Sequence, residues 1–196
     1  MIVLGLTGSI GTGKTTTAAL FAERGVPVHD ADQAVHALYA GAAVQPVEAA
    51  FPGVVCDGVV DRALLSRRLA AEPHRFAELE RMIHPLVRAR ETAFLDAHRA
   101  AGAPLVLLDI PLLFETGAEA RVDRVVVVTC DPAIQRQRVL ARPGMTAEKF
   151  ALVLGRQMAD RDKCARADYI IDTGRGMDAA RARVDAILRD LDSEGD

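Results

Sequence analysis

The chain has 196 residues, half of them hydrophobic, and its 24 lysines and arginines stand against 27 aspartates and glutamates for a formal net charge of −3. This length suits one α/β domain with insertions, and the composition excludes an intrinsically disordered chain and gives no support to a nucleic-acid binder. No apolar run is long enough to span a bilayer and no secretory leader is visible, so we expect a cytoplasmic protein without a membrane partner. The three cysteines lack metal-ligand spacing and are expected to be free thiols.

The first predicted element is a buried strand over residues 2–7, which a glycine-rich stretch separates from a predicted helix over residues 14–24. Residues 8–15 match the pattern G-x-x-x-x-G-K-[ST]. A strand before this pattern and a helix after it are the context that a phosphate-binding loop requires. The alternative is a glycine-rich turn without a ligand.

Each part of this pattern suits a nucleotide. The glycines let successive backbone N–H groups face phosphate oxygens, and the helix N-terminus adds a partial positive charge. The Lys14 ammonium can reach the β- and γ-phosphates, and the Thr15 hydroxyl can bind Mg²⁺. We therefore expect ATP to be bound by Gly8, Gly11, Thr12, Gly13, Lys14, Thr15 and Thr16.

A second short strand is predicted over residues 26–29, followed by Asp30 and Asp32 and by a helix over residues 33–38. One interpretation makes the aspartates helix caps, and Asp30 with Gln33 fits a capping box. The other places a carboxylate at the edge of the sheet where α/β proteins bind ligands. Both hold together if Asp30 caps the helix and Asp32 faces the nucleotide.

Residues 33–102 are expected to form a mostly helical insert. Breakers make residues 41–61 irregular, and Asp61 can cap a helix over residues 62–71. Pro73 and Pro85 each suit the first turn of a further helix, the second of which runs to about Ala101.

A buried parallel strand is predicted over residues 105–109, and it ends in Asp109. A carboxylate at the end of such a strand is what a Walker-B element uses to hold Mg²⁺ directly or through water. Another buried strand follows over residues 125–129, and a fifth over residues 167–172 precedes a terminal helix over residues 178–191.

The segment 132–163 is helical and rich in arginine, with a break at Pro143 and Gly144. Charge runs usually form a solvated face. The alternative is a lid whose arginines cover the phosphates of ATP, which its position after a late strand favours. Its arginines are Arg136, Arg138, Arg142, Arg156 and Arg161.

Taken in order, these segments resemble the dephospho-CoA kinase family over nearly the whole chain. Residues 109–115, Asp-Ile-Pro-Leu-Leu-Phe-Glu, are the most specific match. The other matching segments are residues 5–15, 30–32, 61–62, 79–80, 83–88, 137–138, 142, 157 and 167–172. Two positions depart from the pattern, with Ser9 in place of a glycine and Thr173 in place of an asparagine that would contact adenine.

The resemblance implies transfer of a phosphoryl group from ATP to the ribose 3′-hydroxyl of dephospho-CoA, the last step of coenzyme A synthesis. It implies that Asp32 orients and finally deprotonates that hydroxyl. Lys14 and Arg142 would act on the transferring phosphoryl group, with Arg138 as a further nucleotide contact and Thr15 and Asp109 as the Mg²⁺ site. The acceptor would be bound by Asp32, Arg62, His84 and Arg88.

The expected fold is an α/β three-layer sandwich of the P-loop NTPase type, with a five-stranded parallel sheet. Its one kinase domain would comprise a nucleotide-binding core (1–32, 103–131 and 164–196), a helical acceptor subdomain (33–102) and a lid (132–163). A nucleoside monophosphate kinase is the alternative with the same mechanism. A regulatory GTPase would need an Asn-Lys-x-Asp motif and a transport ATPase an LSGGQ-like one, and the sequence has neither.

Overall fold

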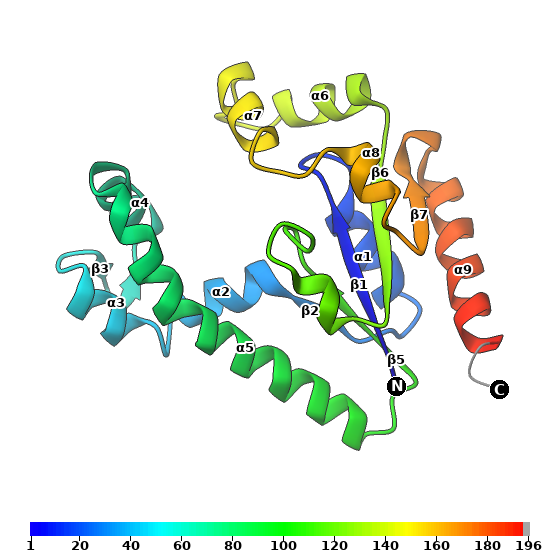
Figure 1. The fold of residues 1–196 in the computed structure, drawn as a ribbon, viewed down its shortest axis with the longest axis horizontal. Helices are drawn as coiled ribbons and strands as arrows, with labels where there is room; N and C mark the ends of the chain where they lie inside the picture. The colour runs from blue at the N-terminus through cyan, green and yellow to red at the C-terminus, as the bar shows by residue number, and fades with distance from the viewer. Residues whose placement is uncertain (194–196) are drawn as a thin grey trace. The chain divides into compact units, whose positions relative to one another are not determined.

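The computed structural model in Figure 1 describes residues 1–193. The chain divides into two compact units. Unit 1 combines the two ends of the chain, Met1–Val28 and Gly102–Asp196, and unit 2 is the segment His29–Ala101 between them.

A five-stranded sheet has the strand order β2-β5-β1-β6-β7, and all of it except the last two residues of β2 belongs to unit 1. The central strand β1 pairs in parallel with β5 and β6, and β6 pairs in parallel with β7. The strands are β1 (Ile2–Gly8), β2 (Val28–Asp30), β5 (Leu105–Asp109), β6 (Arg124–Thr129) and β7 (Tyr169–Asp172). The predicted α/β fold with a five-stranded parallel sheet is therefore confirmed.

Helices α1 and α9 lie side by side on one face of this sheet, as Figure 1 shows, and enclose the main core. The core contains Leu4 and Leu6 of β1, Phe21 of α1 and Ile187 of α9, all at most 2% exposed. The helices of unit 1 are α1 (Lys14–Ala22), α6 (Pro132–Leu140), α7 (Ala147–Leu154), α8 (Asp160–Cys164) and α9 (Met177–Ser193), with 3-10 turns η2 (Ala118–Arg121) and η3 (Thr173–Arg175).

Unit 2 is built from helices around a separate core that includes Leu38, Val47, Phe51 and Leu65. Its long helix α5 is the green ribbon of Figure 1. The elements of unit 2 are α2 (Ala31–Tyr39), α3 (Val44–Ala50), β3 (Val55–Cys56), β4 (Val59–Val60), α4 (Arg62–Ala71), η1 (Pro73–Arg75) and α5 (Phe76–Ala100).

The prediction that a new helix begins at Pro85 is wrong, because α5 begins at Phe76 and continues through Pro85 without interruption. A proline inside a helix removes one backbone hydrogen bond and costs about 3 kcal/mol. Leu79 and Ile83 before it are buried in the core of unit 2, and Leu86 and Val87 after it pack against the same core. Burial on both sides of the proline keeps the helix continuous, and the proline ring itself is exposed.

The prediction that residues 41–61 are irregular is also wrong. Helix α3 tolerates Pro46 because this proline occupies its third position, where a backbone N–H has no partner within the helix. A two-stranded hairpin follows, in which Val55 pairs with Val60. Its turn is formed by Asp57 and Gly58, whose φ angles are +50° and +77°. An Asp-Gly pair between β-branched residues is a hairpin signal that the sequence contains.

Three further observations concern the whole described chain. Cys56, Cys130 and Cys164 are free thiols, as predicted. Within residues 1–193, no helix combines the length and the apolar character that a membrane span needs. The segment 132–163, predicted to be a lid, contains α6, α7 and all of α8 except its last residue, and the predicted break at Pro143 and Gly144 lies between α6 and α7.

Candidate active site

The loop between β1 and α1 has a backbone that only glycine can supply. Gly11 and Gly13 adopt positive φ angles of +82° and +99°, in the left-handed region. A Cβ atom on Gly8 would lie 2.6 Å from the carbonyl oxygen of Val128, and one on Gly11 would lie 2.3 Å from Cγ2 of Val139. The loop therefore packs closely on β6 and α6, and its glycines give the backbone the kind of turn in which N–H groups can face a phosphate.

Hydroxyl groups inside the loop fix its shape. Thr12 is buried, and its Oγ1 donates to the carbonyl oxygen of Ser9 at 2.9 Å, while Thr17 Oγ1 donates to that of Gly13 at 3.1 Å. Thr15 and Thr16 are exposed in the first turn of α1. The buried hydroxyls therefore hold the turn, and the exposed ones are available to a nucleotide and a metal.

Two glutamine side chains hold the peptide groups of Ile10 at the centre of the loop. The Ile10 N–H donates to Oε1 of Gln157 at 2.9 Å. The buried Gln135 of α6 donates from Nε2 to the Ile10 carbonyl oxygen at 2.8 Å. Gln157 follows α7, so α6 and the residues after α7 both contact the phosphate-binding loop. Gln135 could not be predicted from the sequence. A polar residue in a predicted helix gives no local sign that it will be buried and will donate a hydrogen bond to a peptide group 125 residues away.

Lys14 and Asp109 are brought together by the pairing of their strands. Leu6 of β1 lies opposite Asp109 in the parallel register, and the chain returns from β1 to Lys14 at the start of α1. The Lys14 Nζ atom lies 2.5 Å from Oδ1 of Asp109, and the side chains are 15% and 2% exposed. The lysine of the loop and the carboxylate at the end of β5 therefore form a mostly buried ion pair.

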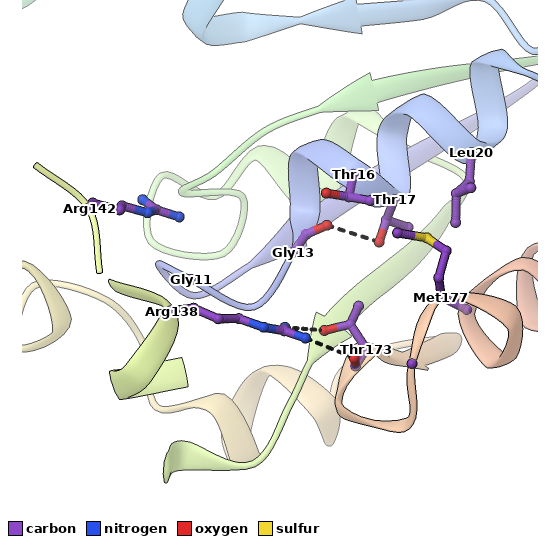
Figure 2. Close-up of a pocket in the computed structure, with 11 residues that line it drawn as sticks. Gly11, Gly13, Thr16, Thr17, Leu20, Arg138, Arg142, Thr173 and Met177 are labelled. Carbon is purple, nitrogen blue, oxygen red and sulfur yellow. Dashed lines mark hydrogen bonds between the residues drawn. The ribbon is translucent and has the colours of Figure 1, made fainter. Parts of the chain in front are cut away.

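A cavity of about 320 Å³ lies beside the loop, in the space between α1, α6 and α9. Figure 2 shows Arg138 and Arg142 at one end of this cavity and Leu20 and Met177 at the other. The cavity thus has a cationic end beside the loop and an apolar end. Its lining residues are Gly11, Gly13, Thr16, Thr17, Leu20, Arg138, Arg142, Thr173, Gly176, Met177 and Ala180.

Thr173 connects α6 to the phosphate-binding loop. Its Oγ1 donates to the Thr12 carbonyl oxygen at 2.5 Å. Arg138 donates twice to Thr173, from Nη1 to Oγ1 at 2.8 Å and from Nη2 to the carbonyl oxygen at 3.0 Å, as the dashed lines of Figure 2 mark. These bonds direct the Arg138 guanidinium along the cavity wall. Arg136, Arg156 and Arg161 are exposed and are not among the residues that line the cavity.

The acceptor-side residues predicted from the sequence lie in unit 2. Asp30 caps α2, since its carboxylate accepts from the Gln33 N–H at 3.0 Å, and Asp32 is exposed in the first turn of the same helix. His84 and Arg88 are exposed and one turn apart on α5.

Arg62 begins α4 and lies near Tyr39 in unit 2. Burial raises the pKa of the Tyr39 hydroxyl, and the positive charge of Arg62 opposes that rise. The buried Tyr39 thus lies within the electrostatic range of the Arg62 charge.

The donors fit a magnesium ion that is shared with phosphates. Among the described residues no group of three or more histidines, cysteines, aspartates or glutamates could enclose a metal. Mg²⁺ in kinases needs fewer protein ligands, because the phosphates and water supply the others. The exposed Thr15 hydroxyl and the Asp109 carboxylate, at the edge of the loop, are oxygen donors of the required kind.

Comparison with known proteins places these features in one family. The model of the dephospho-CoA kinase family matches residues 2–178. A dephospho-CoA kinase from Rhizobium meliloti is 66% identical over 191 residues, which cover 97% of this chain and 98% of the relative. A dephospho-CoA kinase from Mesorhizobium japonicum is 63% identical over the same length and covers 97% of both.

Solved structures show the same fold. A crystal structure from Thermus thermophilus is 34% identical, covers 97% of each chain and has a TM-score of 0.85. A dephospho-CoA kinase from Campylobacter jejuni has a TM-score of 0.76 at 20% identity, with 99% of this chain and 98% of that chain covered. A shikimate kinase from Bacteroides thetaiotaomicron has a TM-score of 0.51 at 18% identity, with coverage of 97% and 98%. The last two likenesses concern the fold alone.

Proposed function

The chain belongs to the dephospho-CoA kinase family, and we propose that it transfers the γ-phosphoryl group of ATP to the ribose 3′-hydroxyl of dephospho-CoA. The products are ADP and coenzyme A, and the reaction is the last step of coenzyme A synthesis. The observation that carries this proposal is the 66% identity to a dephospho-CoA kinase over nearly the full length of both chains. A cytoplasmic location and the absence of nucleic-acid and membrane partners remain predictions from the sequence.

ATP would bind along the loop and the cavity beside it. The phosphates would meet N–H groups of the loop and of the first turn of α1, other than those of Ile10 and Thr12, which donate within the protein. The adenosine would meet the apolar end of the cavity at Leu20 and Met177. The Lys14 ammonium has three N–H donors, so it can keep its contact with Asp109 and also donate to a phosphate oxygen. The Thr15 hydroxyl and Asp109 would hold Mg²⁺, which neutralises phosphate charge when bound.

The transferring group needs positive charge because the transition state spreads negative charge over its equatorial oxygens. Arg142 lines the cavity and would place its guanidinium over these oxygens, and Arg138 lies on the same wall. Both residues come from the segment 132–163, which we propose closes over ATP as a lid. Closure would exclude water, which otherwise competes with the acceptor hydroxyl.

The acceptor would be held by unit 2. Asp32 is a carboxylate that is not needed as the cap of α2, since Asp30 fills that position. We assign it the role of orienting the ribose 3′-hydroxyl and finally accepting its proton. Arg62, His84 and Arg88 are proposed as contacts to the rest of dephospho-CoA, whose diphosphate favours cationic partners.

A coupled assay of ADP release tests this function. Dephospho-CoA, AMP and shikimate are supplied in turn at equal concentration with ATP and Mg²⁺, and a reaction without acceptor measures background ATP hydrolysis. We expect ADP release above background with dephospho-CoA alone. Equal or faster release with AMP would instead favour a nucleoside monophosphate kinase.

A further inference from the structure

Lys163 is a completely buried lysine in helix α8, with an exposed fraction of 0%. Its Nζ atom lies 2.9 Å from Oε1 of Glu115, whose side chain is 15% exposed. Among the described residues, the buried Lys163 Nζ atom has no partner with hydrogen-bond geometry, so its interaction with Glu115 is an ion pair. Burying two charges costs several kcal/mol per ion before their attraction is counted, so the pair calls for an explanation other than stability alone.

The same oxygen of Glu115 also holds the segment by which the lid returns to the core. The Met158 N–H donates to Oε1 of Glu115 at 2.7 Å, while the buried Oε2 has no hydrogen-bond partner in the described part of the chain. Burial raises the pKa of the Glu115 carboxyl. The interactions with Lys163 and with the Met158 N–H lower this pKa by more than burial raises it, so the net shift is downward. Glu115 is therefore a carboxylate that joins two parts of the lid segment.

The helix that carries Lys163 is itself fixed to the sheet. Thr129, the last residue of β6, donates from Oγ1 to Oδ2 of Asp160 at 2.5 Å. Asp160 opens α8, so this bond and the Glu115–Lys163 pair hold both ends of the helix. Helix α8 is thus a fixed base for the lid.

Met158 is the direct neighbour of Gln157, whose side chain accepts the Ile10 N–H of the phosphate-binding loop. We propose that Glu115 and Lys163 are positioning residues: they fix Met158 so that Gln157 holds the loop in the shape that binds the phosphates of ATP. A group placed six residues after Asp109 then acts on the loop through the lid. This inference rests on the proposed function only insofar as ATP is the ligand of the loop.

A pair of double variants separates this role from simple stability. Glu115→Ala with Lys163→Met removes both charges together, which avoids leaving one buried charge alone, and it removes the acceptor for the Met158 N–H. Glu115→Gln with Lys163→Met removes the same charges but keeps a carbonyl oxygen that can accept this N–H. Glu23→Gln is the matched control, because Glu23 is exposed and pairs with Arg181 of α9, and neither residue contacts Met158 or Gln157 within the described chain.

The measurement is ATP affinity by calorimetry without any acceptor, so a failure of dephospho-CoA as substrate would leave the test intact. We expect the Ala/Met variant and Gln157→Ala each to weaken ATP binding about five- to tenfold, the effect of one lost hydrogen bond. The Gln/Met variant and Glu23→Gln should stay within about twofold of the wild type. Adding Gln157→Ala to the Ala/Met variant should cause no further loss, because both changes release the same contact.

Three results would overturn the proposal. The first is a Gln/Met variant as weak as the Ala/Met variant, which would make the charges themselves the cause. The second is a full additional loss when Gln157→Ala is combined with the Ala/Met variant. The third is an unchanged ATP affinity of Gln157→Ala, which decides the question even if the Ala/Met variant does not fold.

Discussion

The Nζ atom of Lys14 and the Oδ1 atom of Asp109 are 2.5 Å apart, although Lys14 is proposed to contact phosphate oxygens and Asp109 to hold Mg²⁺. Asp109 is almost wholly buried. Removing one member of a buried ion pair typically costs 3–5 kcal/mol, because the remaining charge loses its compensation. Substitution of Lys14 should therefore affect stability as well as turnover.

A stability cycle at this pair distinguishes the two effects. We expect Lys14→Ala to lower turnover roughly 100- to 1,000-fold, as loss of one preorganised transition-state partner does, and to lower the melting temperature by several degrees. Lys14→Ala combined with Asp109→Asn should recover part of the melting temperature and none of the turnover. Thermal melting and ADP release on the wild type and these two variants measure this. A Lys14→Ala enzyme within about threefold of wild-type turnover would refute the assignment of the loop.

Thr173 should matter through its hydroxyl group. Thr173→Val keeps the shape that packs against Gly13 but removes the bond to the Thr12 carbonyl oxygen and one of the two bonds from Arg138. We expect KM for ATP to rise about five- to tenfold, since about 1 kcal/mol is lost, and Thr173→Ser to restore it. Thr116→Val removes a comparable bond, to the Leu112 carbonyl oxygen, away from the cavity and serves as the control. Equal KM values for the Val and Ser variants would contradict this role.

Substitutions at Asp30 and Asp32 should have different effects, because Asp30 caps α2 and Asp32 is proposed to act on the acceptor hydroxyl. Asp30→Ala removes the side chain that caps α2, so we expect a loss of about 1 kcal/mol in the free energy of unfolding and a modest loss of activity. Asp32→Asn should fold and bind ATP as the wild type does but lose most kinase activity, because an amide cannot take the proton. Paired melting and ADP-release measurements test both. If Asp32→Asn stayed active, the proposed base would have to be another residue.

The stability of the protein should fall in mild acid because of His29. Burial lowers the pKa of this imidazole, Glu91 and Asp30 oppose the shift, and Arg90 adds to it. The unfolded chain therefore takes up a proton below about pH 6.5 while the folded protein resists it, so stability decreases as the pH falls through this range.

The substitution His29→Phe keeps the ring contact with Phe94, whose centroid lies 5.2 Å from that of His29. It should flatten the dependence of melting temperature on pH between about 7 and 5. His36→Gln changes an exposed histidine of the neighbouring helix and is the control. An unchanged slope in His29→Phe would show that another group titrates in this range.

The sequence predicts the elements whose signals are local. The apolar runs give the strands, and residues 62–71 and 105–109 match α4 and β5 to the residue. Glycine spacing identifies the phosphate-binding loop, because the loop needs residues without a Cβ atom at fixed positions within a short stretch of sequence. Boundaries are weaker: the second strand begins at Val28 rather than residue 26, and α2 begins at Ala31 because Asp30 is its cap.

Features that depend on distant contacts do not follow from such signals. Helix α5 continues through Pro85 because both flanks are buried in the core of unit 2, which no local propensity encodes. The contacts of Gln135 with Ile10 and of Thr173 with Thr12 join residues more than 100 positions apart. The resemblance to the family identifies the residues around these contacts, but the structure is needed to show which atoms meet.

The central claim is that the phosphoryl group of ATP reaches the ribose 3′-hydroxyl of dephospho-CoA. The most direct measurement is mass-spectrometric and phosphorus NMR analysis of the product, with 3′-deoxy-dephospho-CoA as the matched acceptor that lacks only the reacting oxygen. We predict a product one phosphoryl group heavier with a new phosphomonoester at the 3′ position, and no product from the 3′-deoxy analogue. Phosphorylation of the 3′-deoxy analogue, or a phosphoryl group at any other oxygen of dephospho-CoA, would contradict the account.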